Sequence, residues 1–179
     1  MIFLSILLLG LAAFPFALEH ARFKMDDTAR KEAPGEFCCL QNGLTHYRYF
    51  GPKAGALFVC IHGLTTPSFV FEALAEELVG KGYRVLVYDH YGRGYSDRPI
   101  GLQSSQFFVE HLQELLDRLG EKDVFDLIGY SMGGAIASAY CAKHPERIKK
   151  LILLAPAGMG HELGFLAKTA SKLPLIGTW

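Results

Sequence analysis

The chain has 179 residues, of which 50% are hydrophobic and 20% are charged, and its 18 basic and 18 acidic residues give a formal net charge of zero. This length and composition fit one globular domain with a substantial core. The balanced charge does not provide the basic surface that binds a nucleic acid backbone, so we expect no nucleic acid partner. The four cysteines form no C-x-x-C pair, which argues against a zinc site or a thioredoxin-like site.

Residues 1–18 form an apolar segment with Ser5 as its only polar side chain. As a helix this segment would span about 27 Å, close to the thickness of the hydrocarbon core of a membrane. No basic residue precedes the apolar run and no small-x-small cleavage site ends it, so an uncleaved membrane anchor is preferred over a signal peptide. Basic residues in the following linker, 19–35, predict a domain on the cytoplasmic side of the membrane, and export after signal cleavage is the alternative.

From residue 36 onward, short β-rich runs alternate with helical stretches. This alternation predicts an α/β fold with a mostly parallel central sheet and helices on both faces. Strands at 37–41 and 45–50 flank Asn42-Gly43 and are expected to form an antiparallel hairpin at the edge of the sheet. Four more strands are predicted at 56–61, 84–88, 124–128 and 150–154, with intervening helices at 68–79, 106–119 and 132–143. Residues 36–158 are thus expected to be the core domain, and 159–179 the start of an inserted cap.

The segment Gly129-Tyr130-Ser131-Met132-Gly133 lies between a predicted strand and a predicted helix. A G-x-S-x-G pattern in this context is typical of a nucleophile elbow, in which a sharp turn presents the serine. Side chains two positions before and after such a serine would collide, which accounts for glycine at 129 and 133. We therefore predict that Ser131 is a catalytic nucleophile.

The segment His62-Gly63-Leu64 follows the predicted strand 56–61. A backbone N–H at this point, together with the N–H of the residue after the nucleophile, would bind the negative charge that develops on an acyl oxygen. Leu64 and Met132 are the two predicted donors of this oxyanion hole. We assign His62 a structural role, because a histidine in a His-Gly turn is more often a structural hydrogen-bonding residue than a base.

A third segment, residues 89–99, directly follows the predicted strand 84–88. Its Gly92-Arg93-Gly94 lacks the third glycine of a dinucleotide-binding loop, so a nucleotide cofactor is not expected. Asp89 is predicted to accept hydrogen bonds from backbone N–H groups of its own turn.

These three segments, in this order and at this spacing, resemble the α/β-hydrolase superfamily over residues 37–158. The resemblance implies a serine esterase or lipase-like enzyme in which Ser131 attacks an acyl carbonyl and water then releases the acyl-enzyme. Dehalogenases and epoxide hydrolases of this fold carry Asp at the position of Ser131, and proline iminopeptidases carry a different His-Gly turn, so these classes are set aside. Esterases, monoacylglycerol lipases and ring-cleavage C–C hydrolases stay open, as do acyltransferases and non-catalytic binding proteins.

The resemblance also implies a triad acid and a histidine that follow Ser131 in the chain. Ala155-Pro156-Ala157-Gly158 follows the last predicted strand without a carboxylate, and His144 and His161 are expected at the surface or at a cap. We therefore expect the triad acid and histidine to be missing from this chain, which would be truncated after the sixth strand and have little activity alone. A serine mechanism implies no metal and no organic cofactor. The expected substrate is a small carboxylic ester, in particular a lipid-like ester, because of the apolar segment 1–18.

Overall fold

The structure is a computed structural model that describes residues 10, 13–14, 16–17, 25–101 and 103–158. The chain divides into two compact units, Met1–Glu32 and Ala33–Trp179. In the first unit, within the predicted linker, the one-turn helix α2 (Asp27–Arg30) is capped by Asp26, whose carboxylate accepts hydrogen bonds from two backbone N–H groups.

Two of the predicted segments fall on residues that the structure leaves undescribed. Most of the apolar segment 1–18 and the whole of the predicted cap element 159–179 lie outside the described residues. A search of the described helices finds none with the length and apolar character needed to cross a membrane.

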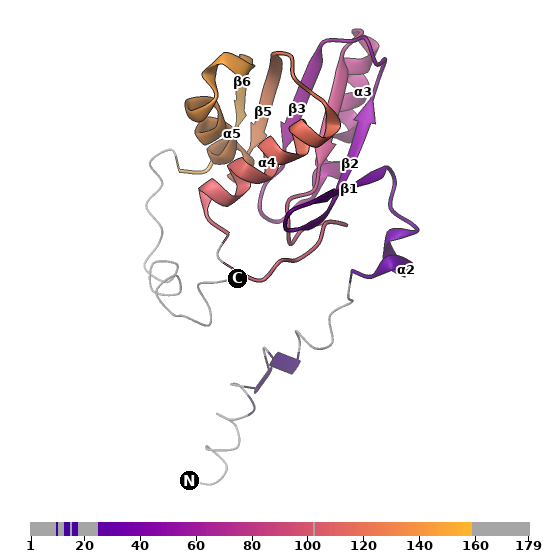
Figure 1. Ribbon diagram of the computed structural model, residues 1–179, viewed down its shortest axis with the longest axis vertical. Helices are drawn as coiled ribbons and strands as arrows, with labels where there is room; N and C mark the ends of the chain where they lie inside the picture. The colour runs from indigo at the N-terminus through magenta and orange to yellow at the C-terminus, as the bar shows by residue number, and fades with distance from the viewer. Residues whose placement is uncertain (1–9, 11–12, 15, 18–24, 102, 159–179) are drawn as a thin grey trace. The chain divides into compact units, whose positions relative to one another are not determined.

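The second unit contains a sheet that has six strands within the described residues, in the order β1-β2-β4-β3-β5-β6 (Figure 1). The β1 and β2 strands are antiparallel to their neighbours, whereas β4, β3, β5 and β6 run parallel. The predicted mostly parallel α/β sheet is therefore confirmed. The strands are β1 (Glu36–Leu40), β2 (Gly43–Phe50), β3 (Leu57–Ile61), β4 (Arg84–Tyr88), β5 (Phe125–Tyr130) and β6 (Ile148–Leu154).

The hairpin at the edge of the sheet turns earlier than predicted. Leu40 pairs with Gly43, so the turn lies at 41–42 and β2 begins at the glycine that was predicted to be in the turn. The Asp97 carboxylate accepts a hydrogen bond of 2.7 Å from the Leu44 N–H, which holds the start of β2 against the loop that follows β4. This tertiary hydrogen bond, in addition to the local Asn-Gly preference, supports the register.

Helices cover both faces of the sheet (Figure 1). The 3₁₀ turn η1 (Ser68–Phe71) and helix α3 (Glu72–Gly80) pack on one face, and α4 (Ser105–Leu119) and α5 (Met132–Lys143) pack on the other. A second 3₁₀ turn, η2 (Pro145–Arg147), leads from α5 into β6.

Successive residues of β3 show why the central strands are apolar throughout. Val59 belongs to the core beneath α4 and α5, whereas Cys60 belongs to the core beneath α3. Side chains alternate between the two faces of a strand, so a strand buried on both faces must be apolar at every position. The strand predicted at 56–61 is therefore confirmed, and it lies inside the sheet, between β4 and β5.

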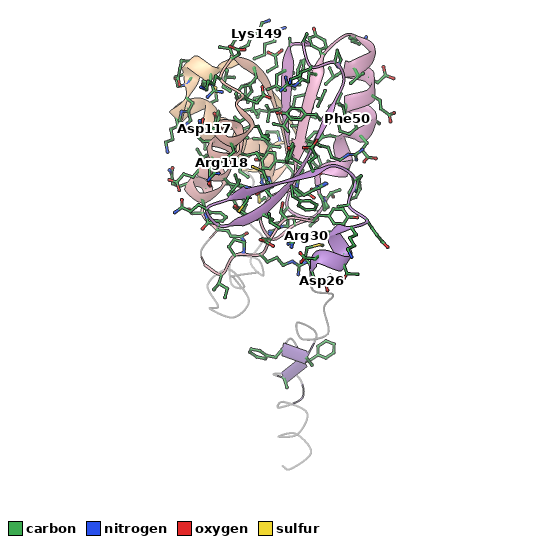
Figure 2. All side chains as sticks on the ribbon, turned by 45° about the vertical axis from the view of Figure 1, so that its right-hand side comes forward. Asp26, Arg30, Phe50, Asp117, Arg118 and Lys149 are labelled. Atoms are coloured by element: carbon green, nitrogen blue, oxygen red, sulfur yellow. The ribbon has the colours of Figure 1, made fainter. Side chains whose placement is uncertain are left out.

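Helix α4 begins and ends at residues that satisfy its terminal backbone groups. The Ser104 hydroxyl accepts an N–H at the start, and Gly120, with a φ of +73°, ends the helix in the left-handed region. Asp117 and Arg118 lie on its exposed side (Figure 2). His111 lies on the buried side of this helix, among apolar side chains.

Four histidines of this unit are buried, namely His46, His62, His90 and His111. Burial lowers the pKa of His62, holds that of His90 well below its usual range, and lowers that of His111 to about 3. The neutral His111 ring stacks on Tyr91 at a centroid distance of 3.9 Å. These three rings are therefore neutral parts of the core at neutral pH.

We expect the free energy of unfolding to fall as the pH is lowered through about 6.5, the ordinary pKa of histidine. The folded pKa values of His62, His90 and His111 lie below the unfolded value, so their contribution is present above pH 6.5 and is lost in acid. Three protons taken up on unfolding correspond to a slope of up to about 4 kcal/mol per pH unit.

Urea unfolding at a series of pH values between 7 and about 5 measures this slope. His111→Gln, which does not titrate, should reduce the proton uptake on unfolding by about one. Unfolding free energies of the wild type that do not change over this interval would show that the three rings accept protons without unfolding.

Candidate active site

Ser131 lies where β5 ends and α5 begins, at a sharp turn of the chain. Its φ of +53° and ψ of −119° are uncommon for a residue with a side chain. The Ser131 N–H donates to the Leu154 carbonyl at 3.0 Å, and the Ser131 carbonyl accepts from the N–H groups of Gly134 and Ala157, each at 2.9 Å. The end of β6 therefore helps to hold the turn that presents the serine.

Close approach of backbone segments requires glycine on both sides of Ser131. A Cβ at Gly133 would lie 2.0 Å from the Ile61 carbonyl oxygen, and a Cβ at Gly129 would lie 2.5 Å from the Gly133 carbonyl oxygen. A Cβ at Gly63 would lie 3.1 Å from the Cβ of Ser131. The end of β3, the turn after it and the elbow therefore pack directly against one another, and the structure brings Gly63, Ser131 and Gly133 together.

Two backbone N–H groups flank this point of contact. Met132 is the first residue of α5, where an N–H has no carbonyl one helical turn earlier, and Leu64 directly follows Gly63. In the part of the chain that the structure describes, neither the Leu64 N–H nor the Met132 N–H donates a hydrogen bond. Unpaired N–H groups of this kind attract negative charge, particularly at the start of a helix.

The His62 ring is fully buried, and both of its nitrogens interact with the backbone. Nε2 accepts a hydrogen bond of 2.9 Å from the His90 N–H, so the ring proton is on Nδ1, which donates to the Gly63 carbonyl at 2.7 Å. Burial lowers the pKa of His62 even though the Asp89 carboxylate opposes this effect. Neither nitrogen is available to take a proton from Ser131.

The Asp89 carboxylate is buried and joins three segments of the chain. It accepts hydrogen bonds from the Tyr95 N–H in its own turn, from the Ser68 N–H after β3, and from the His46 ring in β2, at 3.0, 2.8 and 2.8 Å respectively. Burial by itself would raise the pKa of Asp89, but these hydrogen bonds outweigh burial and lower it. The carboxylate is therefore ionised and ties the loops after β3 and β4 to the sheet.

Arg93 and His46 are site-supporting residues that the sequence analysis did not assign. The Arg93 Nε–H donates to the Leu64 carbonyl at 3.0 Å, and the His46 Nε2–H donates to the Pro34 carbonyl at 2.6 Å. Arg93 stands within the G-x-G of the segment 89–99, and His46 stands within a predicted strand. The one sequence signal for a supporting role is that each is a polar residue in such a place.

Among the residues that the structure describes, no general base forms a hydrogen bond with the serine hydroxyl. Within the described residues the Ser131 hydroxyl has no hydrogen-bond partner, and no group of three potential metal ligands is found there. His144 is half-buried, with its ring 4.8 Å from that of Tyr140, and its Nδ1 lies 3.9 Å from Glu146. His161 lies outside the described residues.

The chain is similar to known proteins. A family model described as alpha/beta hydrolase fold matches residues 56–175. The chain is 42% identical over 82 residues to 2-hydroxymuconate semialdehyde hydrolase of Pseudomonas sp. (strain CF600), a match that covers 45% of this chain and 29% of that protein. It is 35% identical over 113 residues to Lipase 1 of Psychrobacter immobilis, covering 63% of this chain and 35% of the lipase.

Among solved structures, an esterase from Exiguobacterium antarcticum is 30% identical and superposes with a TM-score of 0.64, covering 70% of this chain and 46% of the esterase. The matched part of the chain thus covers less than half the length of each of these three proteins.

We expect Gly133→Ala to destabilise the protein by about 3 kcal/mol or more, because the added methyl group would meet backbone atoms that cannot move independently. Gly80→Ala is the matched control, since a Cβ at Gly80, the last residue of α3, meets nothing within 4 Å. This control is expected to be neutral or slightly stabilising. Thermal unfolding compares the two variants, and equal stabilities would contradict the close approach of α5 to the end of β3.

Proposed function

Because the chain belongs to the α/β-hydrolase family, we propose that it forms the core of a serine hydrolase that cleaves carboxylic esters through an acyl-enzyme on Ser131. One observation carries this proposal. Ser131 stands at a strained strand-to-helix turn, packed against Gly63, and the N–H groups of Leu64 and Met132, which directly follow Gly63 and Ser131 in the chain, have no acceptor among the described residues. This arrangement gives a nucleophile and two hydrogen-bond donors on one acyl group.

In the proposed reaction, a general base takes the proton of the Ser131 hydroxyl as the Ser131 oxygen forms a bond to the acyl carbon, and the carbonyl electron pair moves onto the carbonyl oxygen. The N–H groups of Leu64 and Met132 then donate to that oxyanion. Breaking the bond between carbon and the alcohol oxygen releases the alcohol, which takes a proton from the general acid, and leaves the acyl-enzyme. Water then gives one proton to the same base and bonds to the acyl carbon, and the bond from that carbon to the Ser131 oxygen breaks, so that the carboxylic acid leaves and Ser131 takes back a proton. Loss of one oxyanion donor costs roughly 3–4 kcal/mol in comparable enzymes.

The general base is proposed to come from the part of the protein that follows residue 158. His62 has both ring nitrogens engaged by backbone groups, and His46 has acceptors at both of its nitrogens. The matches cover only 29%, 35% and 46% of the three relatives, so each relative has a large part outside the match that can hold a histidine and a carboxylate. A segment of this kind is required for full activity under this proposal.

A lipid-like ester is the proposed substrate class, with association to a membrane through residues 1–18. The apolar composition of that segment supports the association, and the likeness to a lipase supports the substrate. The loop after β3 also presents apolar side chains, since Leu64 is 46% exposed and Phe69 is 60% exposed. Apolar side chains next to an oxyanion donor suit an acyl chain better than a charged one.

Cleavage of a carbon–carbon bond by the same serine is the second proposed function. It is favoured by the 42% identity to a hydrolase whose name gives a semialdehyde, and no ester, as its substrate. Both reactions pass through nucleophilic or proton-transfer steps at the same elbow, so Ser131 and the two N–H donors serve either one.

Labelling with a fluorophosphonate probe tests the nucleophile directly. The full-length protein is expected to be labelled and Ser131→Ala to lose the label, because only an activated serine attacks the probe rapidly. Ser105→Ala removes an exposed serine at the start of α4 and should leave the label unchanged. Equal labelling of wild type and Ser131→Ala would overturn the proposed function.

Assays of the full-length protein separate the two proposed reactions. With p-nitrophenyl esters of graded chain length, we expect hydrolysis whose kcat falls by at least about 1,000-fold in Ser131→Ala. A longer acyl chain should lower KM if the apolar side chains of the β3 loop contact it. Hydrolysis of a ring-fission dienoate with no hydrolysis of any ester would replace the ester assignment by carbon–carbon cleavage.

A further inference from the structure

Arg93 links the loop after β4 to the loop after β3. Its Nε–H donates to the Leu64 carbonyl at 3.0 Å, and Nη1 donates to the Tyr91 carbonyl at 3.4 Å and to the Gln103 side chain at 3.3 Å. We infer that Arg93 is a positioning residue that holds the Leu64 N–H in place to receive the oxyanion. This inference rests on the proposed function of Ser131, and it names a residue that acts through Leu64 without touching the substrate.

The direction of the Leu64 N–H is set by the carbonyl of Gly63. These two groups belong to one peptide unit, in which the carbonyl and the N–H of a trans peptide point in opposite directions. The His62 Nδ1–H holds the Gly63 carbonyl at 2.7 Å, so the Leu64 N–H must point away from the His62 ring. One of the two peptide planes at Leu64 is therefore held by His62.

The other peptide plane at Leu64 is held by Arg93. Within the described residues, the Arg93 guanidinium is the one hydrogen-bond donor to the Leu64 carbonyl. Leu64 and Thr65 are exposed, so packing restrains this peptide little. If the guanidinium were removed, the chain after Leu64 could rotate, and the hydrogen bond from His62 to Gly63 would be left as the one restraint on the position of the Leu64 N–H among the described hydrogen bonds.

One tight turn supports both peptide planes. The His90 N–H donates to His62 Nε2 at 2.9 Å, which places the His62 proton on the nitrogen that holds Gly63. Three residues later, the Arg93 N–H donates to the His90 carbonyl at 3.0 Å, and the Arg93 carbonyl accepts from the Ser96 N–H at 3.2 Å. The backbone at Arg93 is therefore fixed, and its side chain can hold the Leu64 carbonyl in place.

The acceptors of the Arg93 guanidinium are all uncharged, being two carbonyls and one amide. In the part of the chain that is described, no carboxylate pairs with it. Partial burial and, to a lesser extent, the charge of Arg98 lower the pKa of Arg93, but an arginine stays protonated at neutral pH. Its donors are thus always present, and lysine cannot copy their forked geometry.

The test is steady-state hydrolysis of a p-nitrophenyl ester by the full-length protein. We expect Arg93→Ala to lower kcat by about 10- to 100-fold, less than direct loss of an oxyanion donor, with KM within about threefold of the wild type. Arg98→Ala, which removes an exposed charge from the same loop, should keep kcat within about twofold. A residue that only stabilises the fold would lower the melting temperature without this separation of kcat from KM.

Arg93→Lys distinguishes geometry from charge, and it decides the question if Arg93→Ala does not fold. Lysine keeps the charge without the fork, so kcat is expected to stay at least about fivefold below the wild type. A wild-type kcat in Arg93→Lys, or in Arg93→Ala, would overturn the inference. If Ser131→Ala is inactive while both Arg93 variants are normal, only this inference fails, whereas an active Ser131→Ala removes the proposed function itself.

Discussion

The close approach of the start of α5 to the end of β3 is the constraint on which the site depends. Gly133 lies so near the carbonyls of Ile61 and His62 that a Cβ would be 2.0 and 2.6 Å from them. This contact brings together two turns that are far apart in the sequence, one carrying Ser131 and the other carrying Gly63. It exists because β3 and β5 are parallel neighbours, whose carboxyl ends meet at the same edge of the sheet.

Buried polar groups then give these turns a single arrangement. The Asp89 carboxylate accepts hydrogen bonds from β2, from the loop after β3 and from its own turn, while His62 and His90 join the ends of β3 and β4. An unsatisfied polar group in such a place is costly, so a loop that moved would lose several hydrogen bonds at once. Under the proposed function, N–H donors on turns held in this way are oriented before a substrate binds, as stabilisation of a transition-state charge requires.

Features that depend on short, local sequence patterns could be predicted from the sequence. The strand 84–88 and the helix 132–143 have the predicted bounds. The sharp turn at Ser131 was predicted from the five-residue motif 129–133. The supporting contacts could not be predicted, because their partners are distant in the chain. His46 and Asp89 are 43 residues apart, and Arg93 and Leu64 are 29 residues apart. Local propensity also misplaced the hairpin turn, where pairing between β1 and β2 determined the register.

The proposed function requires one geometry: the Leu64 and Met132 N–H groups must point at one oxygen of an acyl group bound to Ser131. A crystal structure of the full-length protein after reaction with a phosphonate ester measures this directly. We expect a covalent bond from the Ser131 oxygen to phosphorus and one phosphonyl oxygen about 2.7–3.1 Å from both nitrogens. A phosphonyl group whose oxygens contact neither N–H, or a bond to another side chain, would contradict it.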